Sequence, residues 1–159
     1  QAVTGVGPTI LPVIFAIFGV GMMIGNVLGG WAADRFGMKA AAGLLLWSAF
    51  ALCLYPLAAQ NLSTLLPVVV MIGIGGGLGS VLQTRLMDVA GDAQTLAAAL
   101  NHSAFNLANA LGPLLGGMAI AAGWGFASTG YVGAGLALGG LAIWVVAYLT
   151  GRKTVVKNP

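Results

Sequence analysis

The chain has 159 residues, of which 59% are hydrophobic and only 6% are charged, and its formal net charge is +3. Soluble domains carry about 25% charged residues, so this composition argues against a soluble enzyme. The weak, scattered charge argues against nucleic acid as a partner, and a single cysteine, one histidine and three acidic residues argue against a disulfide or a protein metal site.

Three long runs contain no Asp, Glu, Lys or Arg: residues 1–33, 40–84 and 93–151. A membrane-spanning helix requires about 20 apolar residues, so each run has room for at least one. The chain also holds 26 glycines, and glycine is more frequent in membrane helices than in soluble ones. We therefore predict an all-α, polytopic integral membrane protein in contact with a lipid bilayer.

In chain order, the uncharged runs and the turn residues between them predict five spanning helices. They cover residues 9–33, 38–57, 63–86, 95–122 and 129–150. The third contains the glycine-rich segment GIGGGLGS, residues 73–80, which satisfies no phosphate-binding motif. We predict that this segment is a flexible or closely packed point of the helix.

Glycines recur at every fourth position in two of the expected helices. The first helix contains Gly21, Gly25 and Gly29, and the last contains Gly135 and Gly139. Small residues at this spacing let membrane helices approach closely. The pattern serves either packing alone or a smooth seam along which helices slide during transport.

All six basic residues fall on one side of the bilayer if successive connections alternate across it. They are Arg35, Lys39, Arg85, Arg152, Lys153 and Lys157, whereas the connections AAQNLST and GWGFAST carry none. The positive-inside rule makes the basic side cytoplasmic. The N-terminus is then expected outside and the C-terminus inside, in agreement with an odd number of spans.

The first connection, within GGWAADRFGMKAAA, holds three of the few charges of the chain. Gly37 supplies the backbone freedom for a reversal within about four residues. Asp34 can accept hydrogen bonds from the open N–H groups of a neighbouring helix N-terminus, and Arg35 and Lys39 can pair with carboxylates or lipid head groups. Contacts that form in one conformation and break in another would make a gate. A plain loop that sets topology is the simpler alternative.

This connection resembles the loop signature of the major facilitator superfamily, G-x-x-x-D-R-x-G-R-K. The matching residues are Gly30, Asp34, Arg35, Gly37 and Lys39, with Met38 in place of the usual arginine. In that family the motif joins helices two and three, and a weaker copy joins helices eight and nine. The substitution by Met38 makes this motif resemble the weaker copy. The resemblance implies that the five helices are helices eight to twelve of a twelve-helix transporter, a partial half-bundle whose N-terminal half and seventh helix are missing here.

A second resemblance lies in the fourth expected helix. Gly112, Pro113, Gly116 and Gly117 resemble G-P-x-x-G-G, the core of the signature of drug/proton antiporters in the superfamily. That signature belongs to helix five, whose pseudo-symmetric counterpart is helix eleven. Pro113 removes a backbone hydrogen bond and should kink the helix. Residues 83–112 are also similar to sugar and drug efflux members of the arabinose-efflux type.

The most polar stretch inside an expected span is NHSAFNLAN, residues 101–109. His102, Asn106 and Asn109 fall at i, i+4 and i+7, on one face of a helix. Polar side chains in hydrocarbon are costly, so this face must meet other helices or a water-filled cavity. The three residues are candidates for a substrate or proton pathway, because His102 can titrate near neutral pH. Hydrogen bonding between helices is the alternative.

The resemblance implies a fragment of a secondary active transporter of the bacterial inner membrane, an antiporter that couples efflux of a small organic solute, drug or sugar to protons. Such transport needs no cofactor or metal, and the chain is not expected to be an enzyme. Its expected partners are the bilayer, the missing half of the transporter, the solute and protons. The alternative is a five-helix membrane subunit or anchor of a larger complex, without transport of its own.

Overall fold

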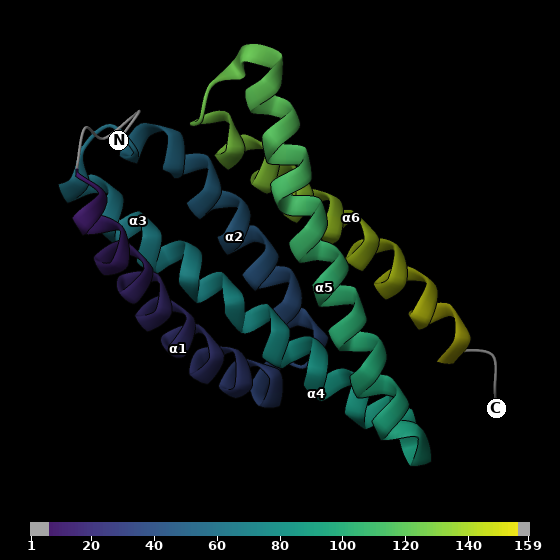
Figure 1. The fold of residues 1–159 in the computed structure, drawn as a ribbon. Helices are drawn as coiled ribbons and strands as arrows, with labels where there is room; N and C mark the ends of the chain where they lie inside the picture. Colours follow the sequence, from purple (N-terminus) through teal and green to yellow (C-terminus); the bar gives the residue numbers. More distant parts are fainter. Residues whose placement is uncertain (1–6, 156–159) are drawn as a thin grey trace.

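The computed structural model describes residues 7–155, with side chains for Gly7 and residues 9–150, and this part of the chain is all-α (Figure 1). The helices are α1 (Leu11–Phe36), α2 (Met38–Ala58), α3 (Leu62–Ile74), α4 (Leu78–Ala90), α5 (Gln94–Ala119) and α6 (Ser128–Val155). Short 3-10 segments are η1 (Pro8–Ile10), η2 (Gly75–Gly77) and η3 (Gly91–Ala93), and η4 (Ile120–Trp124) is π-helical. The prediction of an all-α fold is confirmed.

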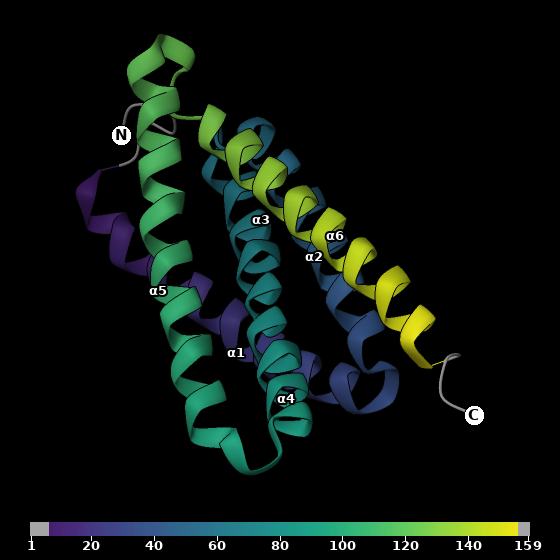
Figure 2. The same ribbon diagram turned by 90° about the vertical axis from the view of Figure 1, so that its right-hand side faces the viewer.

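Four continuous helical segments of the described chain are long and apolar enough to cross a membrane: Leu11–Phe36, Met38–Ala58, Leu62–Trp124 and Ser128–Thr150. The third has 63 residues, which would be about 95 Å long if straight, against about 30 Å of hydrocarbon. It instead reverses direction between α4 and α5 (Figure 2). The expected five separate helices are thus four continuous segments, because the reversal at η3 keeps a helical hydrogen-bond pattern and turns on Gly91, whose φ is +52°.

The segment α3–η2–α4 runs through the middle of the bundle and contacts α1, α2 and α5. Helix α6 lies along α2 in both views, and it also contacts α5 (Figures 1 and 2). Helix α5 packs on α4 and α6 and does not contact α1 or α2. A large part of the α5 surface is therefore free of neighbours within the described chain.

The glycines of α1 form a seam against α3 and η2, as their spacing predicts. A Cβ atom on Gly21 would lie 2.5 Å from the carbonyl oxygen of Val70, and Cβ atoms on Gly25 and Gly29 would overlap the backbone of Ile74 and Gly77. Only hydrogen side chains allow the two backbones to approach this closely. The same contact explains the glycine-rich segment at η2, which is a closely packed point of its helix.

The glycines at this spacing in the last helix have no such contact within the described chain. Cβ atoms added to Gly135 and Gly139 would meet nothing within 4 Å in the described structure. The glycines of α6 that pack closely are others: a Cβ on Gly130 would lie 2.7 Å from the carbonyl oxygen of Leu52, and one on Gly133 would lie 3.1 Å from the Leu52 side chain. Spacing identifies a face of small residues, but it does not say which face meets the neighbouring helix.

Much of the surface of the bundle is apolar. The buried core consists mostly of alanine, and the largest fully buried side chain is Val81. Large apolar side chains lie outside instead, including Phe15, Val27 and Ile143, each about 70% exposed. Such a surface is compatible with hydrocarbon and not with water. The chain is therefore an integral membrane protein whose helices contact lipid.

Candidate functional site

Helix α5 presents two exposed faces of opposite character. His102, Asn106 and Asn109 are exposed on one of them, which we call the polar face. The exposed Leu107 and Leu114 belong to the other, which is apolar except for Ser103, whose hydroxyl donates to the carbonyl of Ala99 at 3.0 Å. At 3.6 residues per turn, the centres of the two faces lie about 120° apart around the helix. The side of α5 that packs on α4 lies beside the polar face, where the ring of Phe105 approaches Gly79.

A buried amide pair joins α4 to α5 next to the polar face. The Asn101 side chain is 8% exposed, and its Nδ2–H donates a hydrogen bond to Oε1 of Gln83. Helical spacing from His102 does not identify this pair, because Asn101 lies on the adjacent, packed face of α5. The signal available in the sequence was the presence of two amides in otherwise apolar runs, on helices joined by a short turn.

A second polar contact joins α1 to the same side of α4. The hydroxyl of Ser80 donates to Oδ1 of Asn26 at 3.3 Å, and the hydroxyl of Thr84 donates to the carbonyl of Ser80 at 2.9 Å. Ser80, Gln83 and Thr84 lie at i, i+3 and i+4 and so share one face of α4. Through this face, α4 makes side-chain hydrogen bonds to both α1 and α5. Asn26 was not singled out from the sequence, because it stands alone in its run.

The loop motif forms the turn between α1 and α2. The predicted connection of about four residues is too long, since α1 continues to Phe36 and the reversal uses Gly37 alone, with φ +54° and ψ −137°. The Gly37 N–H donates to the carbonyl of Ala33 at 2.8 Å, and the Gly37 carbonyl accepts from the N–H of Ala40 at 3.0 Å. A positive φ of this kind favours glycine, which accounts for this position of the motif.

The charged residues of the motif point outward. Asp34, Arg35 and Lys39 are all exposed, and no side chain caps the start of α2. The Asp34 carboxylate is therefore not used by the nearest helix N-terminus and is available to another element. A Cβ added to Gly30 would meet nothing within 4 Å, so packing within the described chain does not require glycine there. The structure does not bring this turn to the polar face, because α5 touches neither α1 nor α2.

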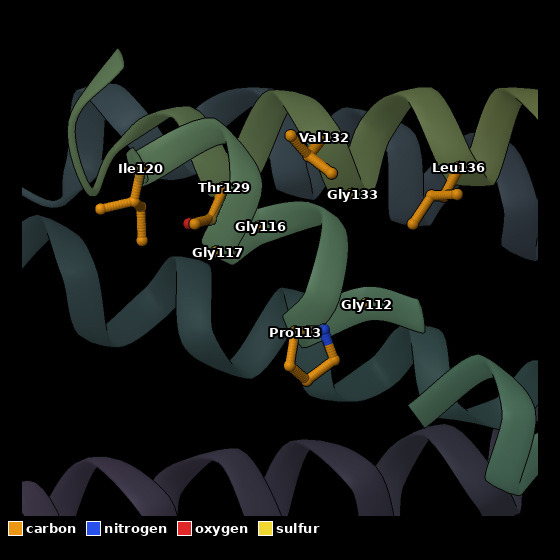
Figure 3. Close-up of a pocket in the computed structure, with 9 residues that line it drawn as sticks. All are labelled: Gly112, Pro113, Gly116, Gly117, Ile120, Thr129, Val132, Gly133 and Leu136. Carbon is orange, nitrogen blue, oxygen red and sulfur yellow. The ribbon is translucent and has the colours of Figure 1, made fainter. Parts of the chain in front are cut away.

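The four residues of the G-P-x-x-G-G segment line a cavity of about 430 Å³ between α5 and α6, which we call the glycine groove (Figure 3). Gly112, Pro113, Gly116 and Gly117 lie on the α5 side, and Val132 and Leu136 face them from α6 (Figure 3). The hydroxyl of Thr129, at the end of the groove, already donates to the carbonyl of Phe126 at 2.8 Å. The groove thus offers almost no polar group to a ligand.

Helix α5 continues past Pro113 to Ala119. The kink expected at this proline stays a prediction. The irregular backbone lies later, in η4, where Gly123 has a φ of +85°. Among the described residues, no group of three His, Cys, Asp or Glu side chains is close enough to hold a metal ion. What the polar face of α5 offers chemically is hydrogen bonding from two amides and one imidazole.

These features define a polytopic helical membrane protein with one polar helix face turned away from its own bundle. The chain belongs to the Major Facilitator Superfamily, whose sequence model matches residues 1–159. The match agrees with the resemblance carried by the loop motif.

Two curated relatives illustrate the family. The chain is 36% identical over 154 residues to the inner membrane transport protein YdhP of Escherichia coli K12, covering 96% of this chain and 39% of that protein. It is 31% identical over 140 residues to the uncharacterized MFS-type transporter YfhI of Bacillus subtilis 168, covering 87% of this chain and 35% of that protein. The chain thus spans well under half the length of these relatives. No solved structure matches it.

Proposed function

We propose that the chain forms helices eight to twelve, in the C-terminal half of a secondary transporter that expels a small organic solute, drug or sugar in exchange for protons. The similarity to an inner membrane transport protein supports transport across the bacterial inner membrane. The substrate classes and the arabinose-efflux type are expectations from the resemblance of residues 83–112. The other half of the transporter is the main protein partner.

The observation that carries this proposal is the contrast between the two exposed faces of α5. Leu107 and Leu114 suit lipid, and both are more than half exposed. His102, Asn106 and Asn109 are exposed as well, but polar groups at membrane depth are costly unless they meet water or protein. A polar face that points away from its own bundle is suited to an aqueous path shared with the other half.

The groove between α5 and α6 supports the presence of further helices. Four of its nine lining residues are glycines, and glycine surfaces favour a closely approaching helix over lipid chains. Transporter halves of this kind consist of inverted three-helix repeats. The first helix of the second repeat is α3–η2–α4, and it packs on both α1 and α2, which belong to the first repeat. By the same symmetry, helix seven, the first of the other repeat, would pack on both α5 and α6.

The orientation follows from the basic residues. The α1–α2 turn, α4 and the C-terminal end of α6 lie toward one end of the bundle (Figure 1), and we place that end in the cytoplasm. The side chains of Arg152, Lys153 and Lys157 lie outside the described part. A cysteine in place of Gln60, which is exposed in the turn between α2 and α3, should react with an impermeant thiol reagent from outside the cell. Reaction only from inside would reverse the orientation.

The loop motif is the proposed gate. Asp34 is exposed and leaves the start of α2 uncapped, so its carboxylate can contact a helix N-terminus of the other half in one conformation and release it in the next. A contact of this kind contributes about 1 kcal/mol, which can bias a gate without unfolding a bundle. Asp34→Ala should therefore lower transport per molecule more than it lowers expression. Wild-type transport per molecule would exclude the gating role.

Cysteine accessibility tests the proposed aqueous path. In the full-length transporter with Cys53 and any other native cysteine replaced by alanine, single cysteines are placed at Asn106 and Asn109 on the polar face and at Leu107 and Leu114 on the apolar face. A thiol must ionise in water to react with a maleimide, so the first pair should react with a water-soluble maleimide and the second should not. If neither pair reacts, the polar face is buried between helices and the proposed path is wrong.

Proton coupling has a separate test. In inside-out vesicles that hold the full-length transporter, a transported solute should accumulate only while a proton gradient exists, and an uncoupler should abolish the accumulation. His102→Gln in the same vesicles separates a role of the imidazole in proton transfer from a role of the amides in solute binding, since only the former would weaken the dependence on the gradient. Accumulation that survives the uncoupler would exclude proton coupling.

A further inference from the structure

A second cavity, of about 530 Å³, lies between α1 and α2 near the turn that joins them. We call it the aromatic groove. The lining residues that matter here are Leu28, Trp31 and Phe36 of α1, and Lys39, Gly43 and Trp47 of α2. The three α2 residues recur at every fourth position, so the groove follows one face of α2 for about 12 Å from the start of the helix.

The walls of this groove are hydrocarbon. Trp31 is 60% exposed and packs edge-to-face with Phe36, their ring centroids 5.7 Å apart. The Nε1–H of Trp47 already donates to the carbonyl of Met71 at 2.8 Å, which leaves only the ring surface for an occupant. A Cβ on Gly43 would meet nothing within 4 Å, so the floor beside it is open. A volume of this size is within the range of about 300–1,000 Å³ typical of ligand pockets.

The lining of the groove includes one charged side chain. Lys39 is the only charged residue that lines the groove, it is exposed, and it belongs to the first turn of α2. Arg35 is exposed in the last turn of α1, and Asp34 beside it opposes the two cations. The three charges of this turn sum to +1, and Lys39 is the one that lines the groove. An occupant therefore needs an apolar body and an anionic end.

We propose that the aromatic groove is a binding site for an anionic phospholipid. Its acyl chain lies against Leu28, Trp31 and Trp47, and its phosphate pairs with the ammonium group of Lys39. Cationic pockets between membrane helices at the cytoplasmic surface select anionic head groups in this way. The site differs from the glycine groove, where four glycines and no charge suit a helix. The site rests on the proposed orientation of the bundle, but lipid binding to it can be measured without transport.

The test is native mass spectrometry of the full-length transporter in detergent, titrated with phosphatidylglycerol or phosphatidylethanolamine. Lys39→Gln should weaken phosphatidylglycerol binding about fivefold, which corresponds to ~1 kcal/mol for one lysine at an anionic lipid surface. Phosphatidylethanolamine binding should not change. The matched control is Arg85→Gln, which removes an exposed cation of α4 outside the groove. An equal loss in both variants would mean general surface charge and would overturn the proposal.

A second variant tests the apolar part of the site. Gly43→Leu places a side chain in the open groove and should reduce phosphatidylglycerol binding at least as much as Lys39→Gln does. Gly135→Leu is the control, because it adds the same side chain to an exposed glycine outside the groove. Size-exclusion profiles establish that both variants are folded. Unchanged lipid binding in folded Gly43→Leu, or displacement of the lipid by inorganic phosphate alone, would show that the groove does not hold the acyl chain.

Discussion

Two glycines of α5, Gly112 and Gly117, have surroundings opposite to those of the α1 glycines. On α1, the backbone of α3 and η2 fills the space that side chains on Gly21, Gly25 and Gly29 would need. On α5, Cβ atoms on Gly112 and Gly117 would meet nothing within 4 Å, and a cavity lies in front of them. The same residue type thus marks a completed helix contact in one place and an open one in the other.

The difference shows which helices have complete contacts within this bundle and which do not. Membrane helices have little hydrophobic drive to associate with one another, so their contacts depend on close packing and hydrogen bonds. Helix α1 has both, through its glycine seam and the Asn26–Ser80 hydrogen bond. Helix α5 has the Asn101–Gln83 bond to α4 but a vacant groove beside α6. In the proposed transporter, the region of α5 is therefore where a further helix would pack.

The largest expected effect comes from filling the completed contact. Gly25→Leu would drive a side chain into the backbone of Ile74, and overpacking against backbone should cost at least about 3 kcal/mol of the free energy of unfolding. Thermal unfolding of the purified full-length transporter measures the loss. Gly19→Leu is the control on the same helix, because a Cβ there would meet nothing within 4 Å. Equal melting temperatures for the two variants would contradict the observed seam.

A smaller but more informative effect is expected at the open contact. If helix seven occupies the glycine groove, Gly117→Leu should destabilise the full-length transporter by about 1–3 kcal/mol. Gly135→Leu, on the exposed surface of α6 outside the groove, should stay within about 0.5 kcal/mol of wild type. Both positions have open space in the described chain, so a difference between them reports the missing partner. Equal stabilities would mean that no helix occupies the glycine groove and that it faces lipid.

The buried amide pair should contribute less than either glycine contact. Asn101→Ala leaves the Gln83 side chain without its donor, and hydrogen bonds between membrane helices contribute about 0.6 kcal/mol on average and at most about 1.7. A double-mutant cycle with Gln83→Ala in the full-length transporter measures the coupling. Additive losses would mean that the two amides do not depend on each other and that α5 is held to α4 by packing alone.

Much of the fold followed from local patterns that a sequence displays. Uncharged runs predicted the helices, four-residue spacing predicted the α1 seam, and the position of Gly37 predicted the reversal. The failures have a common cause, which is that the rotation of one helix against another is a tertiary property. Gly135 was expected to pack, and Asn101 was passed over for its exposed neighbours, because periodicity defines a face without naming what covers it. The cavity in front of Gly112 depends on α6 and could not be predicted from the motif.

The smallest effect on stability and the most specific effect on function are expected at the polar face. Asn106 and Asn109 are exposed and make no contact that holds α5 to its own bundle, unlike Asn101. Asn106→Ala and Asn109→Ala should therefore leave the melting temperature of the full-length transporter nearly unchanged. Each should weaken solute binding about two- to tenfold, the equivalent of one hydrogen bond of about 0.5–1.5 kcal/mol. Binding and thermal unfolding measured on the same preparations separate the two possible roles. A loss of stability near 0.6 kcal/mol with unchanged affinity would identify these amides as hydrogen bonds between helices, and it would move the solute path away from α5 toward the polar side of α4.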